Sequence, residues 1–273
     1  MVNNQMKIFL TGVSGQVGRR LVERLEPLGD LIALDRQQLD LSSPDHIRRT
    51  LFSFAPDLII NPAAFTAVDR AESEYAIAHA INAVAPGIIG EVANQLGATV
   101  IHFSTDYVFD GQSATPYRES DQTCPINRYG VTKRDGEVAL LASKANALIL
   151  RTSWVFDSEG HNFLRTMLRL ACERDTLRVV SDQLGAPTSA RSLADAVAAI
   201  VATDAFRTHQ QELTGIYHAT ASGQTSWHRY ASHAIAYARS RDWPIRVTAG
   251  AIQAVSSDAF PTAAKRPRNS RLD

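Results

Sequence analysis

The sequence has 273 residues, 45% of them hydrophobic, and no net formal charge. These values suit one large globular domain or two closely joined ones, and they give no reason to expect nucleic acid or a membrane as a partner. Two cysteines outside any CxxC pair, a polar N-terminus and no evident membrane-spanning run lead us to expect a cytoplasmic protein without a metal site.

The first half alternates short apolar runs, typical of buried strands, with amphipathic runs, typical of helices. We expect strands at 6–10, 31–34, 57–60, 99–103 and 147–150, and helices at 16–25, from 44, at 70–96 with a break near Pro86, and at 128–143. Apolar strands separated by helices indicate a parallel sheet covered on both faces. We therefore predict an α/β fold, a Rossmann-type doubly wound parallel sheet, over residues 1–151.

After residue 151 the pattern becomes mixed and rich in loops. Helices are expected at 163–173, 192–202 and 227–239, and extended segments at 177–180 and 215–218. We assign residues 152–273 mainly to a smaller C-terminal substrate-binding lobe, with some later segments returning to the main sheet.

A glycine-rich loop follows the first expected strand and opens the first helix. Gly12, Gly15 and Gly18 have the spacing GxxGxxG. Small residues let the backbone approach a pyrophosphate, and the helix N-terminus offers free N–H groups and the positive end of a dipole. The pattern favours a dinucleotide site, with a tight turn that binds no ligand as the alternative.

The end of the second strand carries residues of opposite charge. Asp35 lies about twenty residues beyond the loop, where an acid binds the adenosine ribose hydroxyls. Arg36 follows at once and suits a 2′-phosphate. Asp35 favours NAD and Arg36 favours NADP, so the sequence leaves the coenzyme open.

A tyrosine and a lysine are placed four residues apart on the helix expected at 128–143. Tyr129 and Lys133 therefore lie on one helix face. A nearby ammonium favours the phenolate, so Tyr129 is suited to give a proton to a carbonyl oxygen. An exposed pair on a helix surface is the alternative.

The end of the fourth strand strengthens the catalytic interpretation. Thr105 and Asp106 stand at the carboxyl edge of a parallel sheet, where ligands bind. Thr105 is placed to donate a hydrogen bond to the same carbonyl oxygen, and Asp106 to contact sugar hydroxyls. The alternative for each is a role in organising the loop.

These motifs, together with several longer segments, resemble the dTDP-4-dehydrorhamnose reductases, a family of extended short-chain dehydrogenases/reductases. The resemblance runs nearly end to end. It is carried by the stretches 12–18, 61–69 with 71–73, 104–111, 129–133, 151–156, 182–188 and 266–272.

The resemblance implies NADPH-dependent reduction of the 4-keto group of dTDP-4-dehydro-L-rhamnose, with NADH as an alternative coenzyme. It gives Tyr129 the role of proton donor, with Lys133 tuning it and Thr105 orienting the keto oxygen. The implied cofactor residues are Gly12, Gly15, Gln16, Val17, Gly18, Asp35, Arg36, Asp40, Leu41, Ala64, Phe65, Thr66, Tyr129 and Lys133. The implied substrate residues are Val68, Thr105, Asp106, Trp154, Arg266 and Asn269, with core packing as the alternative for Trp154.

The chain departs from the family pattern in three places. Pro62 and Phe65 stand where relatives often have alanine and histidine. Arg20 and Arg191 align with glutamates that bridge some relatives through magnesium, so we expect no magnesium there and a monomer or weak homodimer. Relatives also continue beyond the position of Asp273, so we expect some apolar surface of the second lobe to be uncovered.

Two other functions compete with this one. The first is another nucleotide-sugar reductase, epimerase or dehydratase; dehydratases usually carry an acidic pair after the threonine, whereas Asp106 is followed by Tyr107. The second is a non-catalytic regulatory subunit of the methionine adenosyltransferase type. Intact Thr105, Tyr129 and Lys133 favour the enzyme.

Overall fold

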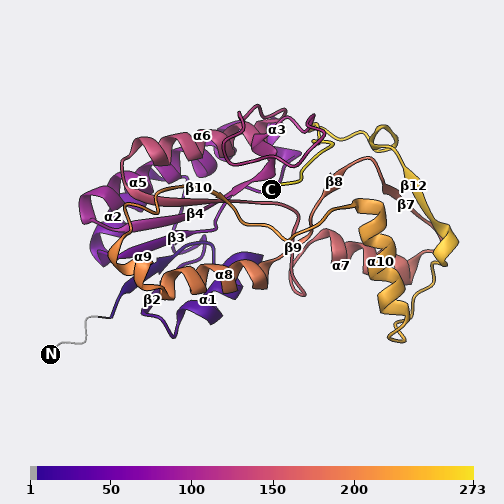
Figure 1. Ribbon diagram of the computed structural model, residues 1–273, viewed down its shortest axis with the longest axis horizontal. Coiled ribbons are helices and arrows are strands. Elements are labelled where there is room, and N and C mark those ends of the chain that lie inside the picture. Colours follow the sequence, from indigo (N-terminus) through magenta and orange to yellow (C-terminus); the bar gives the residue numbers. More distant parts are fainter. Residues whose placement is uncertain (1–4) are drawn as a thin grey trace.

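The computed structural model describes residues 5–273, in which six parallel strands form the main sheet (Figure 1). Their order is β10-β5-β4-β3-β1-β2, so the chain reverses direction across the sheet between β1 and β3. Ligands bind at such a switch point, beyond the carboxyl ends of the strands. The strands are β1 (Lys7–Leu10), β2 (Asp30–Ala33), β3 (Leu58–Asn61), β4 (Thr99–Thr105), β5 (Asn146–Thr152) and β10 (Gly215–His218).

Helices cover both faces of this sheet, which confirms the predicted doubly wound fold. On one face lie α2 (Pro44–Phe54), α5 (Ala85–Leu96) and α6 (Arg128–Ala142), and on the other lie α1 (Gln16–Leu25), α8 (Ala190–Ala202) and α9 (Asp204–Thr208). Each layer buries its own cluster of aliphatic side chains against the strands. Local signals set the helix starts: the Ser43 side chain caps α2, with Pro44 as its first residue.

The helical region expected at 70–96 is divided into four parts. After α3 (Arg70–Ser73) and α4 (Tyr75–His79) comes η1 (Ala80–Val84), a π-helical turn just before Pro86, and then α5. By length and composition, the stretch Tyr75–Leu96 could cross a membrane, so our expectation of no such run was wrong. More than half of it (56%) is buried, and α5 packs on α2 and α6, as in the core helix of a globular fold.

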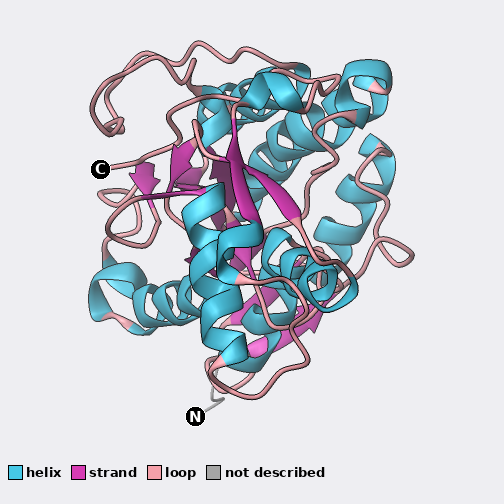
Figure 2. Cartoon of the chain, turned by 90° about the vertical axis from the view of Figure 1, so that its right-hand side faces the viewer, coloured by secondary structure: helices cyan, strands magenta, loops and turns pink. Residues whose placement is uncertain are grey.

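The second lobe has a separate apolar core beyond one end of the main sheet (Figures 1 and 2). Helices α7 (Phe163–Glu173) and α10 (Trp227–Arg239) pack against the parallel pair β7 (Leu177–Val180) and β12 (Ile252–Val255). Short strand pairings of β6 (Val155–Phe156) with β9 (Thr188–Ser189) and of β8 (Leu184–Gly185) with β11 (Thr225–Ser226) complete it.

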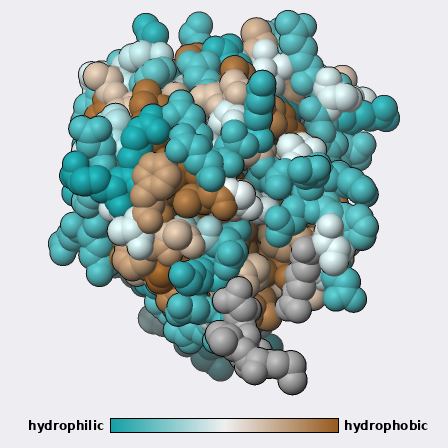
Figure 3. Space-filling view, turned by 90° about the vertical axis from the view of Figure 1, so that its left-hand side faces the viewer, coloured by the Kyte–Doolittle hydropathy of each residue, from teal (hydrophilic) through white to brown (hydrophobic). Residues whose placement is uncertain are grey.

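The chain passes between the two parts several times. After β9 it returns to the main sheet as α8, α9 and β10, then leaves again through β11 and α10. The last residues return once more, where Leu272 bridges to Tyr117. The end of the molecule opposite the second lobe is mostly hydrophilic, with small hydrophobic areas between the polar side chains (Figure 3).

Candidate active site

The loop between β1 and α1 forms a close backbone turn at the switch point. A Cβ on Gly12, whose φ is +61°, would lie 2.8 Å from the Cβ of Ala63, and a Cβ on Gly18 would lie 2.2 Å from the Gly12 carbonyl oxygen. Gly15 caps α1 without any side-chain hydrogen bond, so the first N–H groups of the helix are free for a ligand. This cradle fits the diphosphate of a dinucleotide.

Filling the cradle should weaken cofactor binding. In Gly18→Ala the new methyl group meets backbone, and relieving such overpacking costs ~1–3 kcal/mol, so the NADPH dissociation constant should rise about tenfold or more. Gly250→Ala is the matched control because a Cβ there meets no atom within 4 Å. Fluorescence titration with NADPH measures both, and equal affinity for the Gly18 variant and the parent protein would contradict this role.

The residues predicted for the adenosine half lie beyond β2. The Asp35 carboxylate accepts hydrogen bonds from the N–H groups of Gln37 (2.8 Å) and Gln38 (3.1 Å), and the Arg36 side chain is exposed. Hydrogen bonds from Ser42 lower the pKa of Asp40. Leu41 is buried beside them. Asp35 thus holds its own turn, while Arg36 remains accessible to a phosphate.

The loop after β3 is fixed by an asparagine that the sequence analysis missed. The Asn82 side chain accepts from Phe65 N (2.8 Å) and donates to Phe65 O (3.1 Å) and to Thr132 Oγ1 (3.1 Å). Asn82 lies in the π-helical turn η1, and a Cβ on Gly136 would lie 2.0 Å from its carbonyl oxygen. The predicted cofactor residues 64–66 are thereby tied to α6.

Helix α6 places the predicted catalytic pair at the edge of the sheet where the strands have their carboxyl ends. Tyr129 is 8% exposed and its ring meets Tyr107 edge to face, with centroids 5.5 Å apart. Lys133 is buried, and its Nζ donates to Phe103 O (2.7 Å) and contacts His102 Nε2 (3.3 Å). The pair is therefore not on a solvated helix surface, which was the alternative.

Thr105 and Asp106 lie next to this pair at the end of β4. The Thr105 hydroxyl donates to Asp106 Oδ1 (2.9 Å) and accepts from Tyr107 N (3.2 Å), so both residues do organise the loop. Asp106 Oδ2 is buried without a hydrogen-bond partner among the described residues. Val68 packs in the same cluster as Tyr129. An unpaired buried acceptor beside a phenol suits a site that contacts a hydroxylated ligand.

Burial shapes the electrostatics of the site. It raises the pKa of Tyr129 well above its usual value; the Asp106 charge adds to this shift and the Thr105 hydroxyl opposes it. Burial lowers the pKa of Lys133 to about 8, against the opposing charge of Glu137. Burial also raises the pKa of Asp106 to about 6, an effect that the nearby Ser270 and Thr105 hydroxyls oppose. Tyr129 thus holds its proton at neutral pH, and Lys133, one turn further along α6, loses its proton at an unusually low pH.

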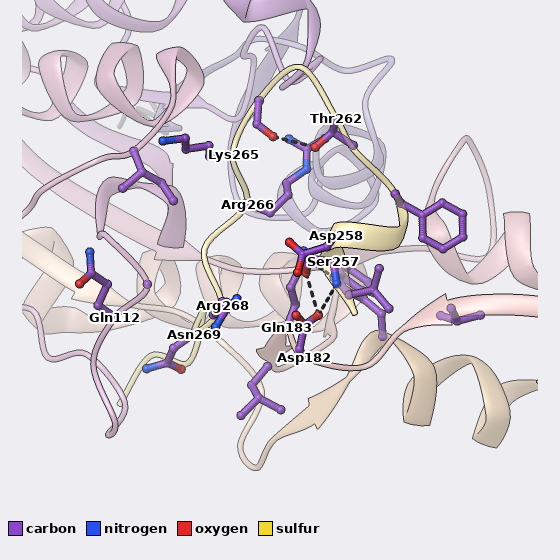
Figure 4. A pocket seen from close by; sticks show the side chains of 18 of the residues that line it. Gln112, Asp182, Gln183, Ser257, Asp258, Thr262, Lys265, Arg266, Arg268 and Asn269 are labelled. Atoms are coloured by element: carbon purple, nitrogen blue, oxygen red, sulfur yellow. Dashed lines mark hydrogen bonds between the residues drawn. The ribbon is translucent and has the colours of Figure 1, made fainter. Parts of the chain in front are cut away.

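A cleft of about 1420 Å³ lies between the two parts of the chain (Figure 4). Its walls combine the loop at 110–114 with residues of the second lobe and the C-terminal segment. The basic side chains Lys265, Arg266 and Arg268 line it, as do Asp182 and Gln183; of these, only Arg266 was predicted. With Arg178 and Arg271, these cations outnumber the three lining carboxylates, so the cleft suits an anionic ligand such as a sugar nucleotide.

The two substrate residues predicted in the C-terminal segment have different surroundings. Arg266 donates to Asp69 (2.6 Å) while its Nη1 is buried without a partner among the described residues. The Asn269 amide donates to the carbonyls of Ser113 (2.9 Å) and Thr115 (2.8 Å), and its oxygen accepts from Arg271. Asn269 therefore holds the segment in place, and its direct contact with substrate stays a prediction.

Trp154 occupies the junction between β5 and the second lobe. Its ring stacks on Trp227 with centroids 3.5 Å apart and planes 8° apart, and its backbone has a φ of +49°, which is rare for a bulky residue. A Cβ on Gly185 would lie 2.4 Å from the ring. The half-buried Trp154 thus packs on Trp227, which lines the cleft, and its direct contact with substrate stays a prediction.

A short segment that contains Asp157 and Asn162 joins the second lobe to α1, the helix that follows the glycine loop. Asp157 accepts two hydrogen bonds of 2.8 Å from Arg20, and Asn162 donates to the side chain of Gln16 (2.8 Å). A cation at this place would meet the Arg20 guanidinium, and Arg191 is exposed. Among residues 5–273, no group of three or more His, Cys, Asp and Glu side chains is arranged to hold a metal ion.

Comparisons with known proteins agree with this geometry. The model of the RmlD substrate binding domain matches residues 6–273. A dTDP-4-dehydrorhamnose reductase of Shigella flexneri is 47% identical over 272 residues, which cover 98% of this chain and 89% of the relative. The crystal structure of the Bacillus anthracis reductase in complex with NADP has a TM-score of 0.89 at 33% identity, covering 98% of this chain and 90% of the other.

A second solved structure, the dTDP-4-dehydrorhamnose reductase ortholog of Clostridium acetobutylicum, has a TM-score of 0.87 at 35% identity, covering 98% of this chain and 90% of that one. The likeness in sequence and structure therefore extends over both the main sheet and the second lobe. This chain belongs to the dTDP-4-dehydrorhamnose reductase family.

Proposed function

We propose that this protein catalyses the NADPH-dependent reduction of the 4-keto group of dTDP-4-dehydro-L-rhamnose to give dTDP-L-rhamnose. The observation that carries the proposal is the buried Tyr129–Lys133 pair beside Thr105 at the carboxyl end of β4, together with a cleft lined with cations. The names of the curated relatives support the same reaction.

Each residue of the pair has a distinct task in this reaction. Tyr129 gives its proton to the keto oxygen, and the ammonium of Lys133 stabilises the phenolate that remains. Thr105 donates a hydrogen bond to the same oxygen, which places the carbonyl and stabilises its developing negative charge. When bound, the reduced nicotinamide supplies the hydride that reaches the carbonyl carbon.

The other site residues hold the two ligands. Gly12, Gly15 and Gly18 with the start of α1 take the diphosphate of the cofactor, Arg36 takes its 2′-phosphate, and residues 64–66 line its length. Asp106 accepts from a sugar hydroxyl through its free Oδ2, and Arg266 faces the sugar nucleotide. We assign residues 152–273 mainly to substrate binding, and propose a cytoplasmic monomer or weak homodimer.

The test is a coupled assay. dTDP-4-dehydro-L-rhamnose is generated in place, the protein is added, and the loss of reduced coenzyme is followed by absorbance for NADPH and, separately, for NADH. Oxidation that depends on the sugar nucleotide, faster with NADPH, is the expected result. Cofactor binding without oxidation would reject the proposed reductase activity. It would favour a different nucleotide-sugar substrate or a role as a regulatory subunit.

The rate of reduction should fall in alkaline solution. Lys133 loses its charge near pH 8 rather than near its usual value, so kcat/KM should be level near pH 7 and decline above about pH 8. The measurement is kcat/KM as a function of pH, with saturating NADPH and varied sugar nucleotide. We call its fall at high pH the alkaline limb. A rate that stays constant to pH 10 would contradict a requirement for the ammonium.

A further inference from the structure

A polar chain that no part of the mechanism above uses runs behind the catalytic lysine. We propose that His102 is a positioning residue, which holds the ammonium of Lys133 in place and links it through Asn61 and Thr11 to the glycine loop. The inference rests on the reductase activity proposed above, and one of its tests does not need turnover.

Lys133 has three N–H directions, and the protein fixes two of them. Nζ donates to Phe103 O at 2.7 Å and contacts His102 Nε2 at 3.3 Å. The amine is tetrahedral, so these two partners determine where the third N–H points. That third direction is the one left for the cofactor and Tyr129, and removing either partner lets the side chain rotate away from it.

The chain continues from the histidine across the sheet. The Asn61 amide nitrogen lies 3.1 Å from His102 Nδ1, and the Thr11 hydroxyl donates to the oxygen of the same amide at 2.6 Å. The three residues are 1–2% exposed and lie on the adjacent strands β4 and β3 and just beyond β1. Thr11 immediately precedes Gly12, so a change in the glycine loop is transmitted by direct hydrogen bonds to Lys133.

The proton positions along this chain depend on one another. An ammonium has no lone pair, so beside it His102 Nε2 must accept, Nδ1 must carry the hydrogen, and Asn61 must present its oxygen. With the Asn61 nitrogen facing Nδ1, the hydrogen moves to Nε2 and Lys133 must be the neutral amine. The Thr11 hydroxyl can donate or accept, so it matches either orientation. The charge of Lys133 and the tautomer of His102 therefore change together.

The surroundings keep His102 itself uncharged. Burial lowers its pKa well below the usual value, and the charge of Lys133 lowers it further. The other charged groups nearby are Glu137, which lies one turn beyond Lys133 on α6, and Arg151 on β5, which is paired with Glu137. His102 thus acts through its tautomer, because its own protonation is suppressed at neutral pH.

Two substitutions at position 102 separate positioning from packing. His102→Phe fills the space without an acceptor, so kcat should fall about tenfold and the alkaline limb should move about one pH unit lower. Glutamine can place an amide oxygen near the position of Nε2, so His102→Gln should keep the limb where it is. A role in packing alone would lower the melting temperature of both variants and leave the limb unmoved in both, which would overturn the proposal.

Thr11→Val tests the far end of the chain and serves if His102→Phe does not fold. Valine has the shape of threonine without its hydroxyl, so Asn61 loses one partner while the loop keeps its packing. The limb should move in the same direction as in His102→Phe and by less. An unchanged limb in a folded Thr11→Val variant would reject the link to the glycine loop.

The tautomer is measured directly by NMR of the free protein labelled with ¹⁵N-histidine, with the His102 signals identified by their loss in His102→Gln. His102 should stay neutral from pH 6 to 9 and exchange Nε2–H for Nδ1–H as Lys133 gains its proton. The change should vanish in Lys133→Met. A single tautomer across this range would overturn the proposal. Because this measurement uses no substrate, a failed reductase assay and a failed coupling are distinguishable.

Discussion

Replacing Tyr129 by phenylalanine is expected to lower turnover by about two orders of magnitude or more while NADPH still binds, because the reaction loses its general acid. The phenol is buried and its pKa is raised, so it keeps its proton until the keto oxygen needs it. The ring itself remains and still packs against Tyr107. The measurement is kcat with saturating substrates, together with a fluorescence titration of NADPH.

Tyr107→Phe is the matched control for this experiment. Tyr107 is also a phenol, half-buried, and it lies against the same ring. Arg266 lies close enough to its hydroxyl to lower its pKa, against the larger raising effect of burial. Turnover in Tyr107→Phe should fall less than about tenfold. Near-normal turnover in Tyr129→Phe, or a larger loss in Tyr107→Phe, would show that Tyr129 is not the proton donor.

Arg151→Met should lower the free energy of unfolding by about 3–5 kcal/mol, because it leaves the Glu137 carboxylate buried without its cation. The two side chains are 2% and 3% exposed and share two hydrogen bonds of 2.9 and 2.7 Å. Ser104 donates to the same carboxylate at 2.5 Å, and the Arg151 guanidinium lies 5.0 Å from the Phe109 ring centroid. Urea denaturation of the parent and the variant measures the difference.

The double variant Arg151→Met with Glu137→Met should recover much of this loss of stability, since it removes both charges and leaves no unpaired charge buried. The exposed pair Arg169–Glu173 on α7 provides the surface control, and Arg169→Met should change stability little. Equal losses in Arg151→Met and in the double variant would show that the cost comes from packing around Arg151. A small loss in Arg151→Met would show that Glu137 finds other partners.

The fold could be predicted from the sequence because the patterns that indicate it lie within short stretches of the chain. Apolar strands alternate with helices that begin at identifiable caps, and the predicted bounds of α1, α7 and α10 match the structure. The spacing of Tyr129 and Lys133 placed both on one face of α6, and the loop glycines coincide with real close contacts. These features depend on residues near one another in the chain, so periodicity and spacing reveal them.

The supporting residues could not be placed in the same way because their partners are distant in sequence. Asn82 forms hydrogen bonds with Phe65 and Thr132. Its function depends on a π-helical turn, which the apolar residues beside it in the sequence do not indicate. Trp154 stacks on Trp227, 73 positions later. Glu137 had one available signal: it follows Lys133 by four residues and therefore shares its helix face.

The return of β10 to the main sheet also determines the order in which the protein can fold. Its residue Gly215 pairs with Leu148, so the last strand of the sheet is synthesised well after β5. At ~5–20 residues per second on the ribosome, the 67 residues from position 149 to 215 take about 3–13 s. During that interval the edge of β5 that β10 will cover keeps its backbone N–H and C=O groups unpaired. The nascent chain should therefore depend most on chaperones, and be most prone to aggregate, between the synthesis of β5 and that of β10.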